Sequence, residues 1–238
     1  MTPAVPIIER PSLVLFDIDQ TMVDVLPQQA TAFAATFQAV YAVSGALEDV
    51  AFAGKTTPNI LREVARLHGV PPGDIEARLP VALETLTAHL APALDHDLRG
   101  TRFPGVVEVL EALTATPHLL GVLTGNPPAI GELILRRAGL ARYFAFGTYG
   151  TEAPTRTDLV RLSIQKAMRI IPTLLPAHTL VIGDSCADVR AAREAGARAI
   201  LVRHPTLPPH PPCVGTDLLL NGFVPVAESV RGIIGLCN

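Results

Sequence analysis

Short apolar segments alternate with helical segments along most of this chain, and this alternation restricts the fold more than any other feature. Strands are expected at 13–16, 118–123, 143–146, 179–182, 199–202 and 218–220. Helices are expected between and after them, at 106–115, 128–138, 158–171, 187–195 and 226–234. Strands that alternate with helices build a parallel sheet covered on both faces. The sequence therefore predicts an α/β fold with a doubly wound parallel sheet.

One long interval, residues 24–100, breaks the alternation because it contains no strand-like run. Helices are expected there at 25–45, 59–68 and 74–94. Asp74 is expected to cap the third of them, and Pro80 to kink or break it, because proline cannot donate a helical hydrogen bond. We therefore predict two units: a core of residues 1–23 and 101–238, and an all-helical unit at 24–100 inserted into it.

Composition narrows the class of protein. Hydrophobic residues make up 49% of the chain, enough for a sizeable core, and the formal net charge of −3 gives no electrostatic reason to expect nucleic acid or an anionic membrane as a partner. No apolar run approaches the roughly 18 residues of a membrane span. Three irregularly spaced cysteines, Cys186, Cys213 and Cys237, indicate neither a disulfide framework nor a metal site, which fits a reducing cytoplasm. We expect a cytoplasmic protein, with its oligomeric state open.

Two carboxylates, Asp17 and Asp19, directly follow the apolar run 13–16. Side chains two residues apart at the end of a strand point to the same face. Ligands of open α/β sheets bind at the carboxyl ends of the strands. Taken alone, the pair has an ordinary explanation as an acidic exit from a strand into a loop.

Polar residues also follow the later strands, or lie in the loops between them: Thr124, Gly125, Asn126, Arg156, Asp184 and Asp188. Each has a structural explanation of its own. Asp184, for example, is suited to cap the helix that follows it, with Asp188 in the first turn. Their coincidence at one edge of a parallel sheet is what favours a functional site.

The chemistry of this set suits phosphoryl transfer. Three carboxylates in a small volume need a cation, and oxygen ligands without nearby histidine or cysteine favour Mg²⁺. The hydroxyl of Thr124, the backbone N–H of Gly125 and the guanidinium of Arg156 supply the groups that phosphate oxygens need. An aspartate can also serve as a nucleophile by forming an acyl phosphate.

The motifs and their order resemble the haloacid dehalogenase-like superfamily of hydrolases. The first is Asp-Ile-Asp-Gln-Thr at 17–21, the second is Thr124, the third is a lysine or arginine, and the fourth is Gly-Asp-Ser-Cys-Ala-Asp at 183–188. The helical insertion resembles the family's alpha-helical cap, on a Rossmann-like core. Residues 54–56 and 104–106 are similar to the branch that contains phosphoglycolate phosphatases and β-phosphoglucomutases.

The resemblance implies roles for named residues. Asp17 would be the nucleophile, and Asp19 the general acid and then base, which argues against dehalogenation because a halide leaves without a proton. The phosphate would be held by Thr124, Gly125, Asn126 and Arg156. Mg²⁺ would be held by Asp17, Asp19 (through its backbone carbonyl), Asp184 and Asp188.

The resemblance also implies a Mg²⁺-dependent phosphatase acting on a small phosphorylated metabolite, with phosphoglycolate as a candidate substrate. The alternatives are a phosphosugar mutase and a non-catalytic binding protein on the same fold. Lys55 and Thr56 would close over the phosphate and bind the leaving group. Two positions stay open: Gln20 stands where the family most often has glycine, and Lys166 is a rival to Arg156 for the third motif.

Overall fold

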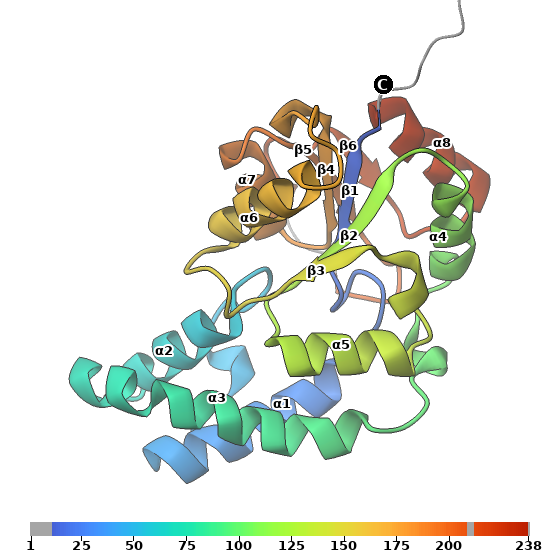
Figure 1. The fold of residues 1–238 in the computed structure, drawn as a ribbon. Coiled ribbons are helices and arrows are strands. Elements are labelled where there is room, and N and C mark those ends of the chain that lie inside the picture. The colour runs from blue at the N-terminus through green and yellow to red at the C-terminus, as the bar shows by residue number, and fades with distance from the viewer. Residues whose placement is uncertain (1–10, 209–211, 238) are drawn as a thin grey trace, which may run out of the picture.

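A computed structural model describes residues 11–208 and 212–237, and its core is a six-stranded parallel sheet (Figure 1). The strands are β1 (Leu13–Phe16), β2 (Leu119–Leu123), β3 (Phe146–Thr148), β4 (Thr179–Gly183), β5 (Arg198–Val202) and β6 (Leu218–Leu220). Their order in the sheet is β3-β2-β1-β4-β5-β6. The predicted α/β fold with a doubly wound parallel sheet is confirmed.

Helices cover both faces of this sheet: α4 (Val106–Thr114), α5 (Pro128–Arg137), α6 (Arg156–Met168), α7 (Cys186–Glu194) and α8 (Val226–Cys237). Val14 and Phe16 point into a core shared with α4, α5 and α8. Leu13 and Leu15 point into the opposite core, against α6 and α7. The alternation of side chains along β1 therefore fills both layers, which is why this strand is apolar throughout.

Residues 24–100, which we call the helical insertion, contain α1 (Leu26–Thr36), α2 (Thr57–Leu67) and α3 (Pro72–Leu94). A π-helical turn at Phe37–Tyr41 extends α1, and short 3₁₀ turns lie at Leu47–Asp49, Arg99–Thr101, Ala141–Tyr143 and Pro176–His178. The insertion lies beyond one end of the sheet (Figure 1). Its two connections to the core run side by side, with Asp24 N donating to Thr101 O at 2.9 Å.

Among the described residues, no helix combines the length and apolar character that crossing a bilayer requires.

Several local predictions differ from the structure. Helix α3 runs unbroken through Pro80. Proline has no N–H, so the backbone carbonyl of Glu76, one turn earlier, has no helical partner. Both Pro80 and Glu76 are exposed, so this carbonyl lies on the solvent side. The same helix begins at Pro72, with Asp74 in its first turn rather than at its cap. The predicted strand at 143–146 is also displaced: Tyr143 ends a 3₁₀ turn, and the strand begins only at Phe146.

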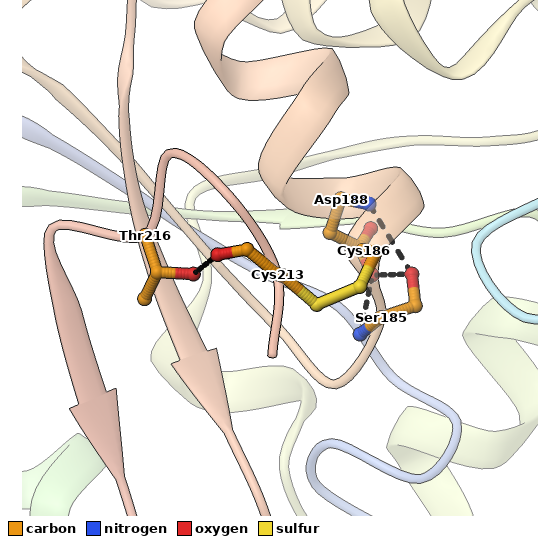
Figure 2. Close-up of a disulfide and its surroundings, with 5 residues drawn as sticks. All are labelled: Ser185, Cys186, Asp188, Cys213 and Thr216. Atoms are coloured by element: carbon orange, nitrogen blue, oxygen red, sulfur yellow. Dashed lines mark hydrogen bonds between the residues drawn. A yellow bond between two sulfur atoms is a disulfide. The ribbon is translucent and has the colours of Figure 1, made fainter. Parts of the chain in front are cut away.

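The cysteine prediction was wrong, because Cys186 and Cys213 form a disulfide. They are separated by 27 residues and come together only because the segment before β6 lies against α7 (Figure 2). The third cysteine, Cys237, is buried in α8. Part of the proline-rich segment 205–212 lies outside the described residues.

Gln20 is one of two non-glycine residues in the described chain with a positive φ, at 58°. This left-handed conformation costs an ordinary residue about 1–2 kcal/mol, which is why glycine is suited to the position. Two hydrogen bonds hold the turn: Gln20 N donates to Val23 O at 2.8 Å, and Gln20 Nε2 donates to Asp24 Oδ1 at 2.7 Å. The tight turn after Asp19 is therefore retained without glycine.

Candidate active site

The site lies at the carboxyl ends of the three central strands. Asp17 follows β1, Thr124 follows β2 and Asp184 follows β4. In the sheet register, Phe16 of β1 pairs with Val122 of β2 and with Ile182 of β4, so the strands end at the same edge. The sheet order β2-β1-β4 thus brings together residues more than 160 positions apart in the chain, such as Thr21 and Asp184, whose Oγ1 and Oδ1 are 3.4 Å apart.

Arg156, the first residue of α6, is the buried cation of the site. Its Nη2 lies 2.7 Å from Asp17 Oδ1 and 2.6 Å from Asp188 Oδ1. Its Nη1 is buried and has no hydrogen-bond partner. Lys166, the rival, lies elsewhere: its Nζ donates to Gly147 O at 2.7 Å and pairs with Glu152. Of the two candidates, only Arg156 contacts the site carboxylates.

Asp19 is held by two side-chain amides. Gln29 Nε2, from α1 of the helical insertion, donates to Asp19 Oδ1 at 2.8 Å, and Asn126 Nδ2 donates to Asp19 Oδ2. Asn126 is in turn held by Thr124, whose Oγ1 accepts from Asn126 N at 3.2 Å and from Asn126 Nδ2 at 3.1 Å. The carboxylate of Asp19 thus touches both the core and the insertion.

Burial shapes the acidity of these groups. It raises the pKa of Asp17 to about 7, against the opposing effect of the Arg156 guanidinium. Burial also raises the pKa of Asp19 to about 6, while the amides of Asn126 and Gln29 favour its ionised form. Burial, followed by repulsion from Asp17 and Asp188, raises the pKa of Asp184 well above its ordinary value. Burial disfavours the charge of Arg156, but Asp188 and Asp17 raise its pKa above the ordinary value.

Asp17, Asp184 and Asp188 offer carboxylate oxygens that all lie within 4.8 Å of one another. Asp17 and Asp188 share Arg156, whereas Asp184 forms no ion pair with a described residue. An arrangement of clustered oxygen donors with uncompensated charge fits a hard divalent cation. The side chain of Asp19 is not part of this cluster.

A cavity of about 70 Å³ opens onto these groups, between the core and the helical insertion. From the core it is lined by Asp17, Asp19, Gln20, Gly125, Asn126, Arg156 and Asp184. From the insertion it is lined by Leu26, Gln29, Phe33, Leu47, Phe52, Ala53, Gly54, Lys55, Thr57 and Ile60. Thr124 and Asp188 do not line it and lie behind the residues that do.

The insertion closes on the core through the loop at 53–57. Thr57 N donates to Gly125 O at 2.9 Å. Gly54 has a φ of 69°, and a Cβ there would lie 2.4 Å from Ser185 Oγ, so the backbone passes too close for a larger residue. Lys55 lines the cavity and pairs with Glu63, while Thr56 is buried, has a hydroxyl without a hydrogen-bond partner, and does not line the cavity.

Sequence reasoning missed four residues that hold the site. Thr21 Oγ1 lies 3.3 Å from Asp17 Oδ2, and Ser185 Oγ donates to Asp188 Oδ2 at 2.6 Å. Glu63 pairs with Lys55, and Gln29 binds Asp19. A signal existed for three of them. Thr21 and Ser185 lie inside the first and fourth motifs. Gln29 is a polar residue on the buried face of α1, in step with Ala32, Phe33 and Thr36.

Comparison with known proteins identifies the family. The family model for haloacid dehalogenase-like hydrolases matches residues 14–202. A protein of Cupriavidus necator named phosphoglycolate phosphatase (plasmid) is 30% identical over 216 residues, 88% of this chain and 89% of that protein. A Pseudomonas putida protein named N-acetylmuramic acid 6-phosphate phosphatase is 27% identical, covering 87% and 91% of the two chains.

Among solved structures, a β-phosphoglucomutase from Clostridium difficile has the same fold, with a TM-score of 0.75 at 14% identity over 94% of this chain and 99% of that one. The match of the family model spans both the first motif and the fourth. The chain belongs to the haloacid dehalogenase-like hydrolase family.

Proposed function

We propose that this protein is a Mg²⁺-dependent phosphatase that hydrolyses a small phosphorylated metabolite through an aspartyl phosphate on Asp17. The observation that carries the proposal is the buried set Asp17, Arg156 and Asp188, joined by contacts of 2.7 and 2.6 Å. It places a carboxylate oxygen beside a guanidinium whose Nη1 is still without a partner. A phosphoryl oxygen would supply the partner that this buried N–H lacks.

In the first step, an oxygen of Asp17 attacks phosphorus and the bond from phosphorus to the substrate oxygen breaks. Asp19, protonated, gives its proton to that oxygen, so that the product leaves as an alcohol. In the second step Asp19, now ionised, takes a proton from the water that attacks the phosphoenzyme, which frees phosphate and restores Asp17. A pKa near 6 suits a group that must serve as both acid and base.

Around these steps, Arg156 and the backbone N–H of Gly125 hold the phosphoryl oxygens. Thr124 accepts the backbone and side-chain N–H groups of Asn126 and so fixes that residue beside Asp19. Mg²⁺, when held by Asp17, Asp184, Asp188 and the backbone carbonyl of Asp19, would neutralise charge on the phosphoryl group. Positioning and charge neutralisation supply most of the acceleration in reactions of this kind.

We assign the catalytic core to residues 1–23 and 101–238, and the cap to the helical insertion at 24–100. Closure of the loop that carries Lys55 and Thr56 excludes water and brings Lys55 to the leaving group. Contacts between Thr57 and Gly125 support this assignment, because they join the two parts beside the cavity.

The substrate is a small metabolite, because the cavity between the core and the insertion measures about 70 Å³. Phosphoglycolate is the first candidate, from the name of the Cupriavidus necator relative. A cytoplasmic location fits such a substrate. A phosphosugar mutase is the runner-up, and it would need the aspartyl phosphate to outlast exposure to water.

A screen of phosphate release over a metabolite panel with Mg²⁺ tests the proposal, with Asp17→Asn protein as the blank. The panel includes phosphoglycolate, an amino-sugar phosphate and several sugar monophosphates. Phosphate release above the blank supports a phosphatase, while isomerised sugar phosphate without release supports the mutase. Equal release by wild type and Asp17→Asn would contradict the proposed role of Asp17.

A further inference from the structure

Cys186 is the first residue of α7 and lies within the fourth motif, residues 183–188, which we call the carboxylate loop. Asp184, two residues earlier, lines the cavity, and Asp188 is two residues later. A disulfide joins Cys186 to Cys213, with Cα atoms 5.1 Å apart, an ordinary separation for such a bond. The bridge therefore attaches directly to the segment that carries two site carboxylates (Figure 2).

The carboxylate loop reaches the nucleophile through a short chain of buried polar contacts. Ser185 Oγ donates to Asp188 Oδ2 at 2.6 Å, and Asp188 N donates back to Ser185 Oγ at 3.2 Å (Figure 2). The other oxygen of Asp188 lies 2.6 Å from Arg156 Nη2, which also pairs with Asp17. A change in the position of Ser185 or Asp188 is thus passed to Arg156.

On the other side of the bridge, the segment that contains Cys213 is held by polar contacts and by packing of Cys213 against the apolar cluster that includes Val189. Arg193, near the far end of α7, donates from Nε to Gly215 O at 2.6 Å and pairs with Asp217. The side chain of Arg193 is 44% exposed, so its ion pair contributes little to stability. The disulfide adds a covalent link between this segment and the N-terminal end of α7.

The same loop forms part of the surface on which the helical insertion closes. A Cβ at Gly54 would lie 2.4 Å from Ser185 Oγ and 2.6 Å from Ala187 Cβ. These are the two chain neighbours of Cys186. The bridge therefore supports both the carboxylates and the contact surface for Gly54.

We propose that Cys186 and Cys213 form a reversible, redox-sensitive bridge that determines how firmly the carboxylate loop is held. With the bridge formed, the loop is ordered and the site is assembled. With the bridge reduced, the loop loosens and its carboxylates bind a divalent cation less tightly.

The chemistry is thiol–disulfide exchange. A thiolate of a dithiol attacks Cys186 Sγ, which belongs to an exposed residue, and the sulfur–sulfur bond breaks. Cys213 leaves as a thiolate and takes up a proton. The second thiol of the reagent then displaces Cys186, so that two electrons and two protons pass to the cysteines and the reagent becomes a cyclic disulfide. A small-molecule disulfide such as oxidised glutathione reverses the reaction.

Mass spectrometry of alkylated protein, before and after dithiothreitol, tests whether the bridge forms. Hydrogen exchange then reports on the loop, and calorimetric titration with Mg²⁺ alone reports on its carboxylates. Reduction, or the Cys213→Ser substitution, is expected to speed exchange in peptides covering 183–190 and 212–217. Either change is also expected to weaken Mg²⁺ binding about tenfold. Loss of a group that supports a metal ligand lowers metal affinity by roughly 10–100-fold, and the expected value is at the lower end of this range.

Cys237→Ser is the matched control, since it removes a cysteine outside the bridge, and it should respond to dithiothreitol as wild type does. Absence of the bridge after treatment with oxidised glutathione, or identical exchange in the oxidised and reduced proteins, would overturn the proposal. The Mg²⁺ measurement rests on the proposed function, whereas mass and exchange do not, so failure of one can be told from failure of the other.

Discussion

Gln29 Nε2 donates a 2.8 Å hydrogen bond to Asp19 Oδ1, so a side chain of the helical insertion contacts the proposed acid–base group of the core. Gln29 is buried at the start of α1, and it also lies 3.5 Å from Asn126 Oδ1. The contact gives the insertion a direct influence on the protonation of Asp19, in addition to covering the cavity.

Gln29→Leu should therefore change the pH dependence of the reaction. The amide of Gln29 favours the ionised form of Asp19, so its loss raises the pKa of that carboxyl further above about 6. We expect the acidic limb of the kcat profile to move to higher pH, with kcat at pH 6 lowered about tenfold. Stopped assays from pH 5 to 9 measure this. Gln28→Leu, at the preceding position of the same helix, is the control and should leave the acidic limb in place. An unshifted acidic limb in Gln29→Leu would contradict the role of the contact between Gln29 and Asp19.

Arg156→Met should lower both the stability and the kcat of the protein more than loss of any other positive charge does. It leaves Asp17 and Asp188 buried without their shared cation, which costs about 3–5 kcal/mol of stability. It also removes charge neutralisation at the phosphoryl group, which is expected to lower kcat by roughly 10²–10³-fold. Lys166→Met is the matched control, and its kcat/KM should stay within about twofold of wild type because its pair with Glu152 is near the surface. Chemical denaturation and steady-state kinetics give both values, and equal effects of the two substitutions would reject Arg156 as the third motif.

The architecture and the carboxylates could be predicted from the sequence because their signals are local. The apolar run at 13–16 ends at Asp17, and the run at 179–182 ends just before Asp184, so each acid is placed by its own strand. The choice between Arg156 and Lys166 was open because it depends on packing between α6 and the ends of β1 and β2. Only the tertiary structure shows that Lys166 points to Glu152.

The disulfide and the turn at Gln20 were beyond the reach of sequence patterns for a related reason. Cys186 and Cys213 carry no spacing signal, and they meet because the segment before β6 lies along α7. Gln20 adopts a conformation that its residue type disfavours, and the neighbouring contacts with Val23 and Asp24 hold it there. The disulfide thus depends on tertiary packing, and the turn depends on local hydrogen bonds that the residue types alone do not indicate.

Gly54→Ala and Gly69→Ala separate backbone strain from closure of the insertion. Both glycines have a positive φ, of 69° and 80°, so each substitution should cost about 1 kcal/mol of stability. A Cβ at Gly69 meets nothing within 4 Å, whereas one at Gly54 would collide with Ser185 and Ala187. We expect KM to rise about tenfold in Gly54→Ala alone, because that loop can no longer close over the substrate. Similar KM values for the two variants would show that the approach of Gly54 to Ser185 is not required.

When a chelator removes divalent metal ions, the contribution of Asp17 to the free energy of unfolding should fall as pH rises. The folded protein raises the pKa of Asp17 to about 7, and an unfolded aspartate titrates near 3.8, so the native state binds more protons between these values. The contribution of Asp17 is therefore complete below about pH 4 and is lost as pH passes 7. The free energy of unfolding of wild type, relative to Asp17→Asn, should decline by a few kcal/mol from pH 4 to pH 7. Denaturant titrations at several pH values measure this difference in the free energy of unfolding. Added Mg²⁺ should restore the stability of wild type at pH 7. A difference that does not change with pH would contradict a raised pKa of Asp17 in the folded protein.

The most direct test of the central claim is mass spectrometry of Asp19→Asn protein quenched in acid after mixing with Mg²⁺ and an aryl phosphate, whose leaving group departs without a proton. A side-chain amide in place of the Asp19 carboxylate cannot deprotonate the attacking water, so the phosphoenzyme formed from this substrate should accumulate. The account predicts a phosphoryl group on the peptide that contains Asp17, and its absence when Asp17 is also replaced by asparagine. Steady release of phosphate by Asp19→Asn without any phosphorylated peptide would contradict an aspartyl phosphate on Asp17.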